Sequence, residues 1–431
     1  MEQNEQELNI VIEDGVLKQF DKAYEGEYVV PSGVTSIQHH AFIECEKLTG
    51  ISIPASVESI GELAFSGCSR LMKITVDKDN PVYDSRENCC AIIETVSDTL
   101  VVGCYNTKVP EGIKRIGENA FDGACFLEDI IIPDSVRVID EWAFSKCYDL
   151  KYIYLPDSLE IIGDAAFYEC ESLEEIHLPE SLKRLGNGAF CLCVGLKRIH
   201  IPASVRLVMG ADRLLVGCES VQHISVDADN RYYDSRENCN AIIESANNRL
   251  IEGCENTLIP NTVVSIANKA FSSSDIMAVI IPESVRHIGK NIFDSCEVLA
   301  HIVVSRSNPV YDSREDCNAI IHSASNTLIC GCKNTVIPNG VSVIDECAFY
   351  GCRGLTTINI PNSVHTIKEY AFAHCKNLTK IEIPDSVTSI NANAFHGCDK
   401  LVISIPSDSK YDIGNFSGVK KVVKRKAKGK K

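Results

Sequence analysis

The sequence of 431 residues lacks several features that would place it in a common class. It has no run of about 18 apolar residues, which excludes a transmembrane helix. Its first residues, MEQNEQELNIVIEDG, have neither the basic nor the apolar region of a secretory signal, so the chain as written is expected in the cytoplasm. No long low-complexity segment is present, and 45% of the residues are hydrophobic, which favours a folded chain.

An excess of positive charge is lacking outside one segment. The net charge is −17, although residues 420–431 (KKVVKRKAKGKK) contain eight basic residues and no acid. The rest of the chain is therefore more acidic than the total, which argues against nucleic acid as a partner. We expect the basic tail to be a solvated end, with weak contact to an anionic surface as the alternative.

Internal repetition is the strongest feature that is present. Most neighbouring prolines are 22 or 23 residues apart, and the repeated unit reads L-x-x-I-x-I-P-x-S-V-x-x-I-G-x-x-A-F-x-x-C, as in residues 150–172. Such a period predicts a mainly-β repeat solenoid, a leucine-rich-repeat-like horseshoe of about 23-residue coils. The L-x-x-I-x-I segments are expected to form a parallel β-sheet that the proline ends, with the phenylalanines filling the interior. The small polar residue two positions after the proline is expected to bond backbone groups in the bend.

This unit resembles the BspA-type leucine-rich repeat family over roughly residues 27–410. The resemblance implies a scaffold whose partners differ from member to member. Its members are typically cell-surface or secreted proteins of bacteria and some protists, associated with adhesion and host interaction. The resemblance therefore suggests a location at the cell surface, whereas the N-terminus of this sequence suggests the cytoplasm.

Three inserts of 33 residues interrupt the period, at about 77–109, 227–259 and 305–337. Each contains Y-D-S-R-E-[ND]-C, then two strand-like runs around a polar turn, which predicts a β-hairpin within a longer coil. The motif combines acids, a hydroxyl, a guanidinium and a thiol, as an active site does. It has no nearby histidine and occurs three times, so we interpret it as structural, with an Arg–Glu ion pair and an Asp-Ser turn. Repeated binding of a small ligand or ion remains an alternative.

The chain contains 21 cysteines, many of them three residues after the coil phenylalanine. Stacked coils would hold these as a buried ladder of reduced thiols. Cys330-Gly-Cys332 and Cys191-Leu-Cys193 lack the spacing of a zinc site. The pairs Cys89/Cys104, Cys239/Cys254 and Cys317/Cys332 stand at the two ends of each hairpin, and whether they form disulfides stays open.

The ends of the chain differ from the repeat. Residues 1–26 contain two strand-like runs around Asp14-Gly15 and are expected to form a capping hairpin, followed by the solenoid at 27–410. Residues 411–431 hold the remnant of a terminal coil and the basic tail. The coil at 203–218 is two residues longer than the others and has Leu214-Leu215 in place of Ala-Phe.

The variable positions of L-x-x-I-x-I should line the concave sheet, where a solenoid of this kind would bind a partner. In the middle coils these positions carry aromatic and charged side chains of the types enriched in binding sites. We call the predicted set the central patch: Tyr152, Tyr154, Glu175, His177, Arg198, His200 and His223. A metal on the three histidines is an alternative that lacks supporting acids in the sequence, so no metal, cofactor or catalytic residue is predicted.

Two classes of function remain. The first is a non-enzymatic module that binds a protein or glycan partner through the concave sheet, with adhesion as its leading version and an intracellular scaffold as the alternative. The second is a carbohydrate- or peptide-active enzyme. It would need a converging pair of carboxylates or a Cys–His pair, and neither is evident in the sequence.

Overall fold

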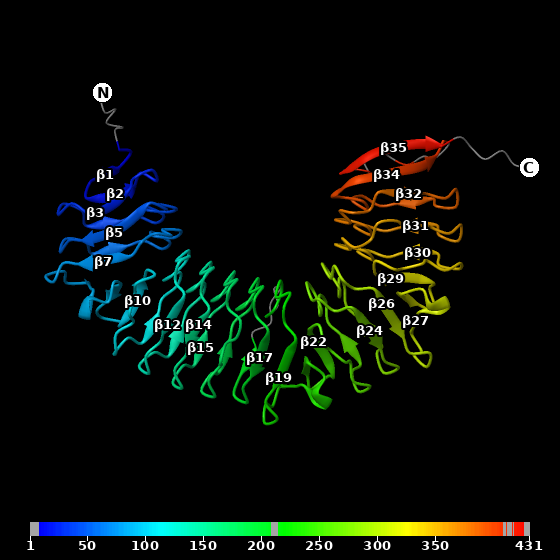
Figure 1. Ribbon diagram of the computed structural model, residues 1–431, viewed down its shortest axis with the longest axis horizontal. Helices are drawn as coiled ribbons and strands as arrows, with labels where there is room; N and C mark the ends of the chain where they lie inside the picture. The colour runs from blue at the N-terminus through cyan, green and yellow to red at the C-terminus, as the bar shows by residue number, and fades with distance from the viewer. Residues whose placement is uncertain (1–7, 208–213, 408–410, 412–415, 417, 426–431) are drawn as a thin grey trace, which may run out of the picture. The chain divides into compact units, whose positions relative to one another are not determined.

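The computed structural model describes residues 8–207, 214–407, 411, 416 and 418–425. They form a mainly-β solenoid, as the repeat predicts, in which the coils of each unit stack on one another (Figure 1). The chain divides into two compact units: unit 1 is Met1–Glu219 with Asp227–Asn230, and unit 2 is Ser220–Val226 with Arg231–Lys431. Within the part of the chain that is described, no helix has the length and apolar character needed to cross a membrane.

The L-x-x-I-x-I segments form the predicted parallel strands, which we call the first ladder. In unit 1 these are β3 (Gly26–Val29), β5 (Leu48–Ile53), β7 (Lys73–Val76), β12 (Asp129–Ile131), β14 (Tyr152–Tyr154) and β17 (Arg198–Ile201). In unit 2 they are β19 (His223–Val226), β24 (Ala278–Ile281), β26 (His301–Val304), β32 (Lys380–Glu382) and β34 (Cys398–Pro406). Ile153 of β14 is buried between two exposed tyrosines, because successive strand residues point to opposite faces.

A second parallel ladder, which the sequence did not reveal, runs through the V-x-x-I half of each coil. In unit 1 it contains β4 (Ser36–Ile37), β6 (Ser59–Ile60), β11 (Arg115–Ile116), β13 (Val138–Ile139), β15 (Ile161–Ile162), β16 (Arg184–Leu185) and β18 (Arg206–Leu207). In unit 2 it contains β23 (Ser265–Ile266), β25 (His287–Ile288), β30 (Val343–Ile344), β31 (Thr366–Ile367) and β33 (Ser389–Ile390). Strands of two residues are too short for the alternation that identifies a strand in a sequence.

Each insert adds an antiparallel hairpin to the second ladder, as predicted. The first insert contains β8 (Tyr83–Asp84), the 3-10 turn η1 (Arg86–Asn88), β9 (Ile92–Glu94) and β10 (Thr99–Val102), in the sheet order β11-β10-β9-β8. The second contains β20 (Tyr233–Asp234), η2 (Arg236–Asn238), β21 (Ala241–Glu244) and β22 (Arg249–Gly253). The third contains β27 (Tyr311–Asp312), η3 (Arg314–Asp316), β28 (Ala319–His322) and β29 (Thr327–Gly331).

The interior of the coils repeats three contacts. Phenylalanine rings of successive coils stack nearly parallel, for example Phe144 on Phe167 with ring centroids 5.4 Å apart. The coil cysteine donates its S–H to the carbonyl of the phenylalanine in the previous coil, as Cys170 Sγ does to Phe144 O at 3.2 Å. A serine two positions after the proline bonds to the backbone of the previous coil: Ser56 Oγ donates to Val34 O at 2.7 Å, and Ser135 Oγ accepts the N–H of Gly112 at 3.0 Å. These contacts confirm the predicted roles of the three repeated residues.

Each coil also bends through left-handed backbone on both sides of its phenylalanine. Around Phe144, Trp142 has φ 56° and Lys146 has φ 58°. Glycine suits this conformation, and Gly67, Gly123, Gly351 and Gly397 stand at the position of Lys146 in other coils. The repeat tolerates other residues there because the backbone hydrogen bonds to the next coil hold the bend, as Lys146 N–H to Tyr168 O does at 2.7 Å.

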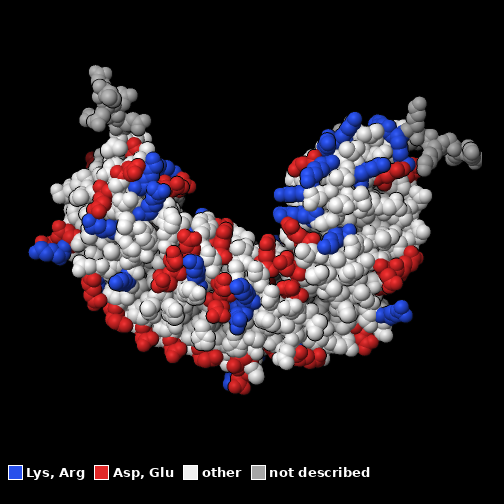
Figure 2. Space-filling view, viewed as in Figure 1, with Lys and Arg blue, Asp and Glu red and all other residues white. Residues whose placement is uncertain are grey.

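The two ends extend the ladders. At the N-terminus β1 (Val11–Glu13) and β2 (Val16–Gln19) form an antiparallel hairpin whose second strand pairs with β4. At the C-terminus β35 (Val419–Arg425) pairs in parallel with β34, so the first part of the predicted solvated tail is a strand. Arg425 makes ion pairs with Glu382 and Asp385, and Figure 2 shows Lys and Arg gathered at this end of unit 2. Residues 426–431 lie outside the described part of the chain.

Candidate functional site

The residues of the central patch occupy exposed positions of the first ladder. Tyr152 and Tyr154 are 55% and 58% exposed, and they flank buried Ile153 on β14. Glu175 and Arg198 face each other across a parallel β-bridge, with Arg198 Nε 3.5 Å from a Glu175 carboxylate oxygen. His177 and His200 are also exposed. Six of the seven predicted residues therefore lie at exposed positions of unit 1: four on β14 and β17, and Glu175 and His177 on the coil between these strands.

The seventh residue, His223, does not continue the row of His177 and His200. It opens β19 as Arg198 opens β17, so it is equivalent to Arg198. Ser225 takes the position equivalent to His200. The three histidines therefore do not stand at one repeated position of the coils. His223 belongs to unit 2.

Exposed apolar residues, which were not predicted, also occupy the outer positions of the first ladder. In unit 1 Ile131 is 67% exposed and pairs in register with Tyr154. In unit 2 Ile280 and Val303 pair in register and are 65% and 48% exposed. These residues occupy the same outer position of L-x-x-I-x-I. The repeat could have predicted them, because a side chain at this position points away from the interior of the coil. An apolar residue there is therefore exposed.

The repeated Y-D-S-R-E motif is a structural turn in each insert. Arg86 donates from Nε and Nη2 to both carboxylate oxygens of Asp84, and from Nη1 to Asp98 at 3.1 Å. Asp84 also accepts the backbone N–H of Arg86, which confirms the predicted Asp-Ser turn. The predicted Arg–Glu pair was wrong, because Glu87 lies in left-handed backbone (φ 57°) and the ion pair runs back to Asp84. Burial opposes ionisation of Asp84, but the Arg86 hydrogen bonds outweigh it and lower its pKa.

The cysteines at the hairpin ends are structural in character. The predicted pairs Cys89/Cys104, Cys239/Cys254 and Cys317/Cys332 are free thiols in the structure. Burial raises the pKa of Cys89 and Cys104 to about 11, so these thiols are protonated at neutral pH. Protonated thiols are poor nucleophiles and poor metal ligands. Cys104 Sγ donates to Cys90 O at 3.3 Å, a structural contact.

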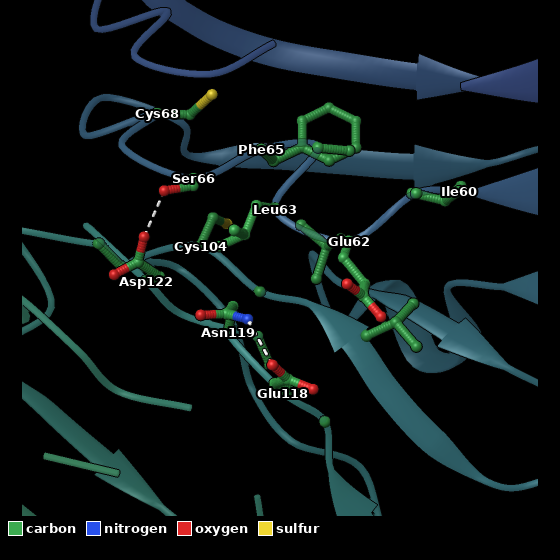
Figure 3. A pocket seen from close by; sticks show the side chains of 18 of the residues that line it. Ile60, Glu62, Leu63, Phe65, Ser66, Cys68, Cys104, Glu118, Asn119 and Asp122 are labelled. Carbon is green, nitrogen blue, oxygen red and sulfur yellow. Dashed lines mark hydrogen bonds between the residues drawn. The ribbon is translucent and has the colours of Figure 1, made fainter. Parts of the chain in front are cut away.

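A cavity of about 280 Å³ opens where the first insert enters unit 1 (Figure 3). Glu62, Glu118 and Asp140 line it, and Ser66 donates a hydrogen bond to Asp122 at one side. Burial and the neighbouring carboxylates of Glu62 and Glu141 raise the pKa of Glu118. A second cavity lies at the third insert in unit 2, with Lys290 and Glu346 in its lining. Because both inserts produce a cavity, the space follows from the way an insert joins the coils.

Comparison with known proteins agrees with the repeat. A family model described as BspA type leucine rich repeat region matches in six copies, over residues 18–96, 103–211, 238–314 and 322–419. A solved leucine rich cell surface protein from Faecalibacterium prausnitzii A2-165 is 24% identical, covers 97% of this chain and 98% of its own, and has a TM-score of 0.53. This likeness supports the fold.

Other solved structures are more distant in shape. A leucine-rich repeat protein from Bacteroides ovatus ATCC 8483 is 24% identical over 97% of this chain and 99% of its own, with a TM-score of 0.36. The pneumococcal vaccine antigen PcpA is 16% identical over 99% and 98%, with a TM-score of 0.37. A comparison with curated proteins gave no match.

Proposed function

This chain belongs to the BspA-type leucine-rich repeat family, and we propose that it is a non-enzymatic adhesion module that binds a protein or glycoprotein through the six central-patch residues of unit 1. Repeats of this kind act in general as protein-interaction modules. They suit this role because the coils stack in register. Each variable position of the repeat then forms a row of exposed side chains on a fixed backbone. The partner would be recognised by the exposed strand residues of unit 1.

The observation that carries the proposal is the exposure of two tyrosines on a rigid strand, next to a paired arginine and glutamate. Tyr152 and Tyr154 bring large surfaces with few torsions to order, and tyrosine and arginine are the residues most often found at binding hot spots. Ile131 beside Tyr154 adds apolar area. The Glu175–Arg198 pair supplies charges at the side of this apolar area, where they favour specificity.

A location at the cell surface is part of the proposal. The similar protein from Faecalibacterium is a leucine rich cell surface protein, which supports display of this chain outside the cell. Protease treatment of intact producer cells, beside lysed controls, tests this location. Cleavage on intact cells would support adhesion, and protection until lysis would favour an intracellular scaffold that uses the same patch.

Binding is tested with variants of the outer strand positions. The purified chain is measured by biolayer interferometry against a panel of immobilised extracellular-matrix and mucosal glycoproteins. The double variant Tyr152→Ala/Tyr154→Ala is expected to lose at least about 2 kcal/mol of binding free energy, since each tyrosine is a hot-spot type. Thr357→Ala/Asn359→Ala changes the equivalent positions of a coil in unit 2 and is expected to bind as the wild type. Equal binding by the wild type and both double variants would refute the central patch as the binding surface.

A further inference from the structure

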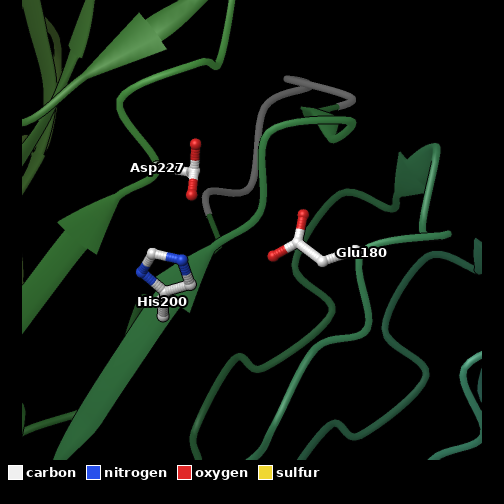
Figure 4. Close-up of side chains that lie close together, drawn as sticks. All are labelled: Glu180, His200 and Asp227. Carbon is white, nitrogen blue, oxygen red and sulfur yellow. The ribbon is translucent and has the colours of Figure 1, made fainter.

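We propose that Glu180, His200 and Asp227 form a binding site for one divalent transition metal ion, of which Zn²⁺ is the best match. The nearest ligand atoms of the three side chains all lie within 4.8 Å of one another. Figure 4 shows the three side chains around a common space, coming from three successive coils. All three residues belong to unit 1. The inference does not depend on the proposed function.

The three residues are positioned by buried or hydrogen-bonded backbone. His200 lies on β17 between Ile199 and Ile201, which are 2% and 0% exposed. Glu180 follows Pro179, and its carbonyl accepts the hydroxyl of Ser204 at 2.7 Å. The site is thus largely formed before a metal binds, and only side-chain torsions remain to be ordered.

Asp227 is held in place by the start of the second insert. Its N–H donates to Ile201 O at 2.9 Å, and its Oδ1 accepts the N–H of Asp229 at 2.8 Å. Asn230 fastens the same turn to the coil of His200, donating to Pro202 O at 2.8 Å and to Val205 O at 3.0 Å. Asp227 stands where most coils have proline, so the insert itself brings the carboxylate to the end of the strand.

The charges around the site favour a cation. Two carboxylates converge here, and among residues 8–207 and 214–407 no Lys or Arg makes an ion pair with either Glu180 or Asp227. A divalent cation would remove the repulsion between the carboxylates. Other acids of the first ladder do have such partners, for example Glu174 with Lys197 at 2.6 Å and Glu175 with Arg198.

The donor set selects the class of metal. Mg²⁺ and Ca²⁺ prefer oxygen ligands throughout, whereas an imidazole with carboxylates suits Zn²⁺ and its neighbours. Zinc bonds to these atoms are about 2.0–2.2 Å long, so tetrahedral ligands stand roughly 3.4 Å apart. The exposed side chain of Glu180 has three torsions with which to shorten the observed separations. Three protein ligands would leave one position for water or for a group from a partner.

The first and third inserts can be compared with the second at the three positions of the proposed metal site. At the positions of Glu180, His200 and Asp227 the first insert has Ser32, Ser52 and Asp77. The third has Asn261, Ile280 and Ser305 at these positions. Asp77 makes the same turn as Asp227, accepting the N–H of Asp79 at 2.9 Å, but serines stand where the second insert has glutamate and histidine. Only the second insert therefore combines the three ligand types.

Titration of the full chain with Co²⁺, in a reducing buffer, tests the site. Cobalt replaces zinc in such sites and its absorption spectrum reveals its ligands. We expect one Co²⁺ per chain by equilibrium dialysis, without the near-ultraviolet sulfur-to-cobalt band that cysteine ligands produce. His200→Ala and Asp227→Asn should each weaken binding about tenfold or more. A sulfur band, or a site that survives His200→Ala, would overturn the inference.

Two matched variants separate this site from general binding to an acidic protein. His177→Ala removes the equivalent histidine one coil earlier, and Asp77→Asn changes the equivalent aspartate of the first insert. Both should bind Co²⁺ as the wild type does. Zn²⁺ should raise the melting temperature of the wild type, His177→Ala and Asp77→Asn, and should not raise that of His200→Ala. If all four variants bound Co²⁺ equally weakly, the binding would be diffuse and electrostatic, and the proposed three-residue site would be rejected.

Discussion

The first and third inserts join the solenoid through the same buried contacts, yet the cavities beside them carry different charges. Asn80 in the first insert and Asn308 in the third each donate to two carbonyls of an earlier coil and accept two N–H groups. A Cβ on Gly103 or on Gly331 would come within 2.2 or 2.1 Å of a phenylalanine ring of the next coil. We call the place where an insert joins the coils a junction. The first and third junctions therefore have the same buried contacts.

The cavity lining differs at equivalent positions. Where the first junction has Glu62 and Asp140, the third has Lys290 and Lys368. The lysines of the third junction make ion pairs, Lys290 with Glu346 at 2.9 Å and Lys368 with Asp345 at 2.8 Å. Buried contacts therefore define how an insert joins the coils, whereas the charges at the surface differ between the two junctions.

The largest expected effect is the same at both junctions. Phe121→Ala and Phe349→Ala each remove a fully buried ring that stacks on the ring of the next coil, at 4.8 and 4.9 Å between centroids. Each should lower the free energy of unfolding by about 3–5 kcal/mol, because the cavity left behind cannot collapse. Urea unfolding followed by circular dichroism measures this. A loss at one junction alone would contradict their structural equivalence.

The junction asparagines come next in size. Asn80→Ala and Asn308→Ala each leave two buried carbonyls without their side-chain donor, which should cost about 1–3 kcal/mol. Asn377→Ala is the control, since its side chain is exposed and its two hydrogen bonds, to Arg353 O and from Lys400 Nζ, lie at the surface. In thermal unfolding, both junction variants should have melting temperatures well below that of the control. Similar values for all three would show that the junctions depend little on these bonds.

The sequence predicted the parts of the fold that follow from a long period or a clear alternation. Tyr152-Ile153-Tyr154 shows strand alternation directly, and the fixed spacing of Phe144 and Cys147 indicates interior rows. The second ladder was missed because Ile161–Ile162 is too short to show a period. The left-handed bends were missed because residues such as Lys146 stand where only some coils have glycine.

The candidate sites depend on contacts that the sequence does not contain. The partner of Arg86 was assigned to Glu87 by adjacency, whereas backbone conformation directs it to Asp84. Glu180, His200 and Asp227 are separated by 20 residues or more, and only the stacking of coils brings their side chains together. The exposure of Tyr152 and Tyr154 could be predicted, because it follows from the alternation of a single strand.

Exchanging the charges should make the two junctions more alike. Lys290→Glu removes the ion pair with Glu346 and creates the acidic lining of the first junction, so stability should fall by about 0.5–1 kcal/mol at low salt. Glu62→Lys places a cation beside Glu118 and should raise stability by a similar or smaller amount. Both effects should shrink in 1 M NaCl, where the Debye length is about 3 Å. Effects of the same sign from the two variants would contradict the charge comparison.

The smallest expected effect concerns the pH dependence of the first junction. Burial, then Glu62 and Glu141, raise the pKa of Glu118 above its ordinary value of 4.5. Between the unfolded and the raised folded pKa the folded chain binds more protons, so this group makes stability fall as pH rises through that window. Glu118→Gln should therefore be slightly more stable than the wild type at neutral pH, by no more than about 0.5 kcal/mol.

This sign is tested by comparing the stability of the wild type with that of Glu118→Gln as a function of pH. The advantage of Glu118→Gln should be absent at pH values below 4.5, grow as the pH rises, and level off above the raised pKa of Glu118. Glu346→Gln at the third junction should act in the opposite direction at neutral pH, because it removes the partner that raises the pKa of Lys290. Melting temperatures of both variants from pH 4 to pH 8 measure the contrast. If Glu118→Gln destabilised the chain at neutral pH, a cation would have to offset the burial and the acidic neighbours that raise the pKa of Glu118.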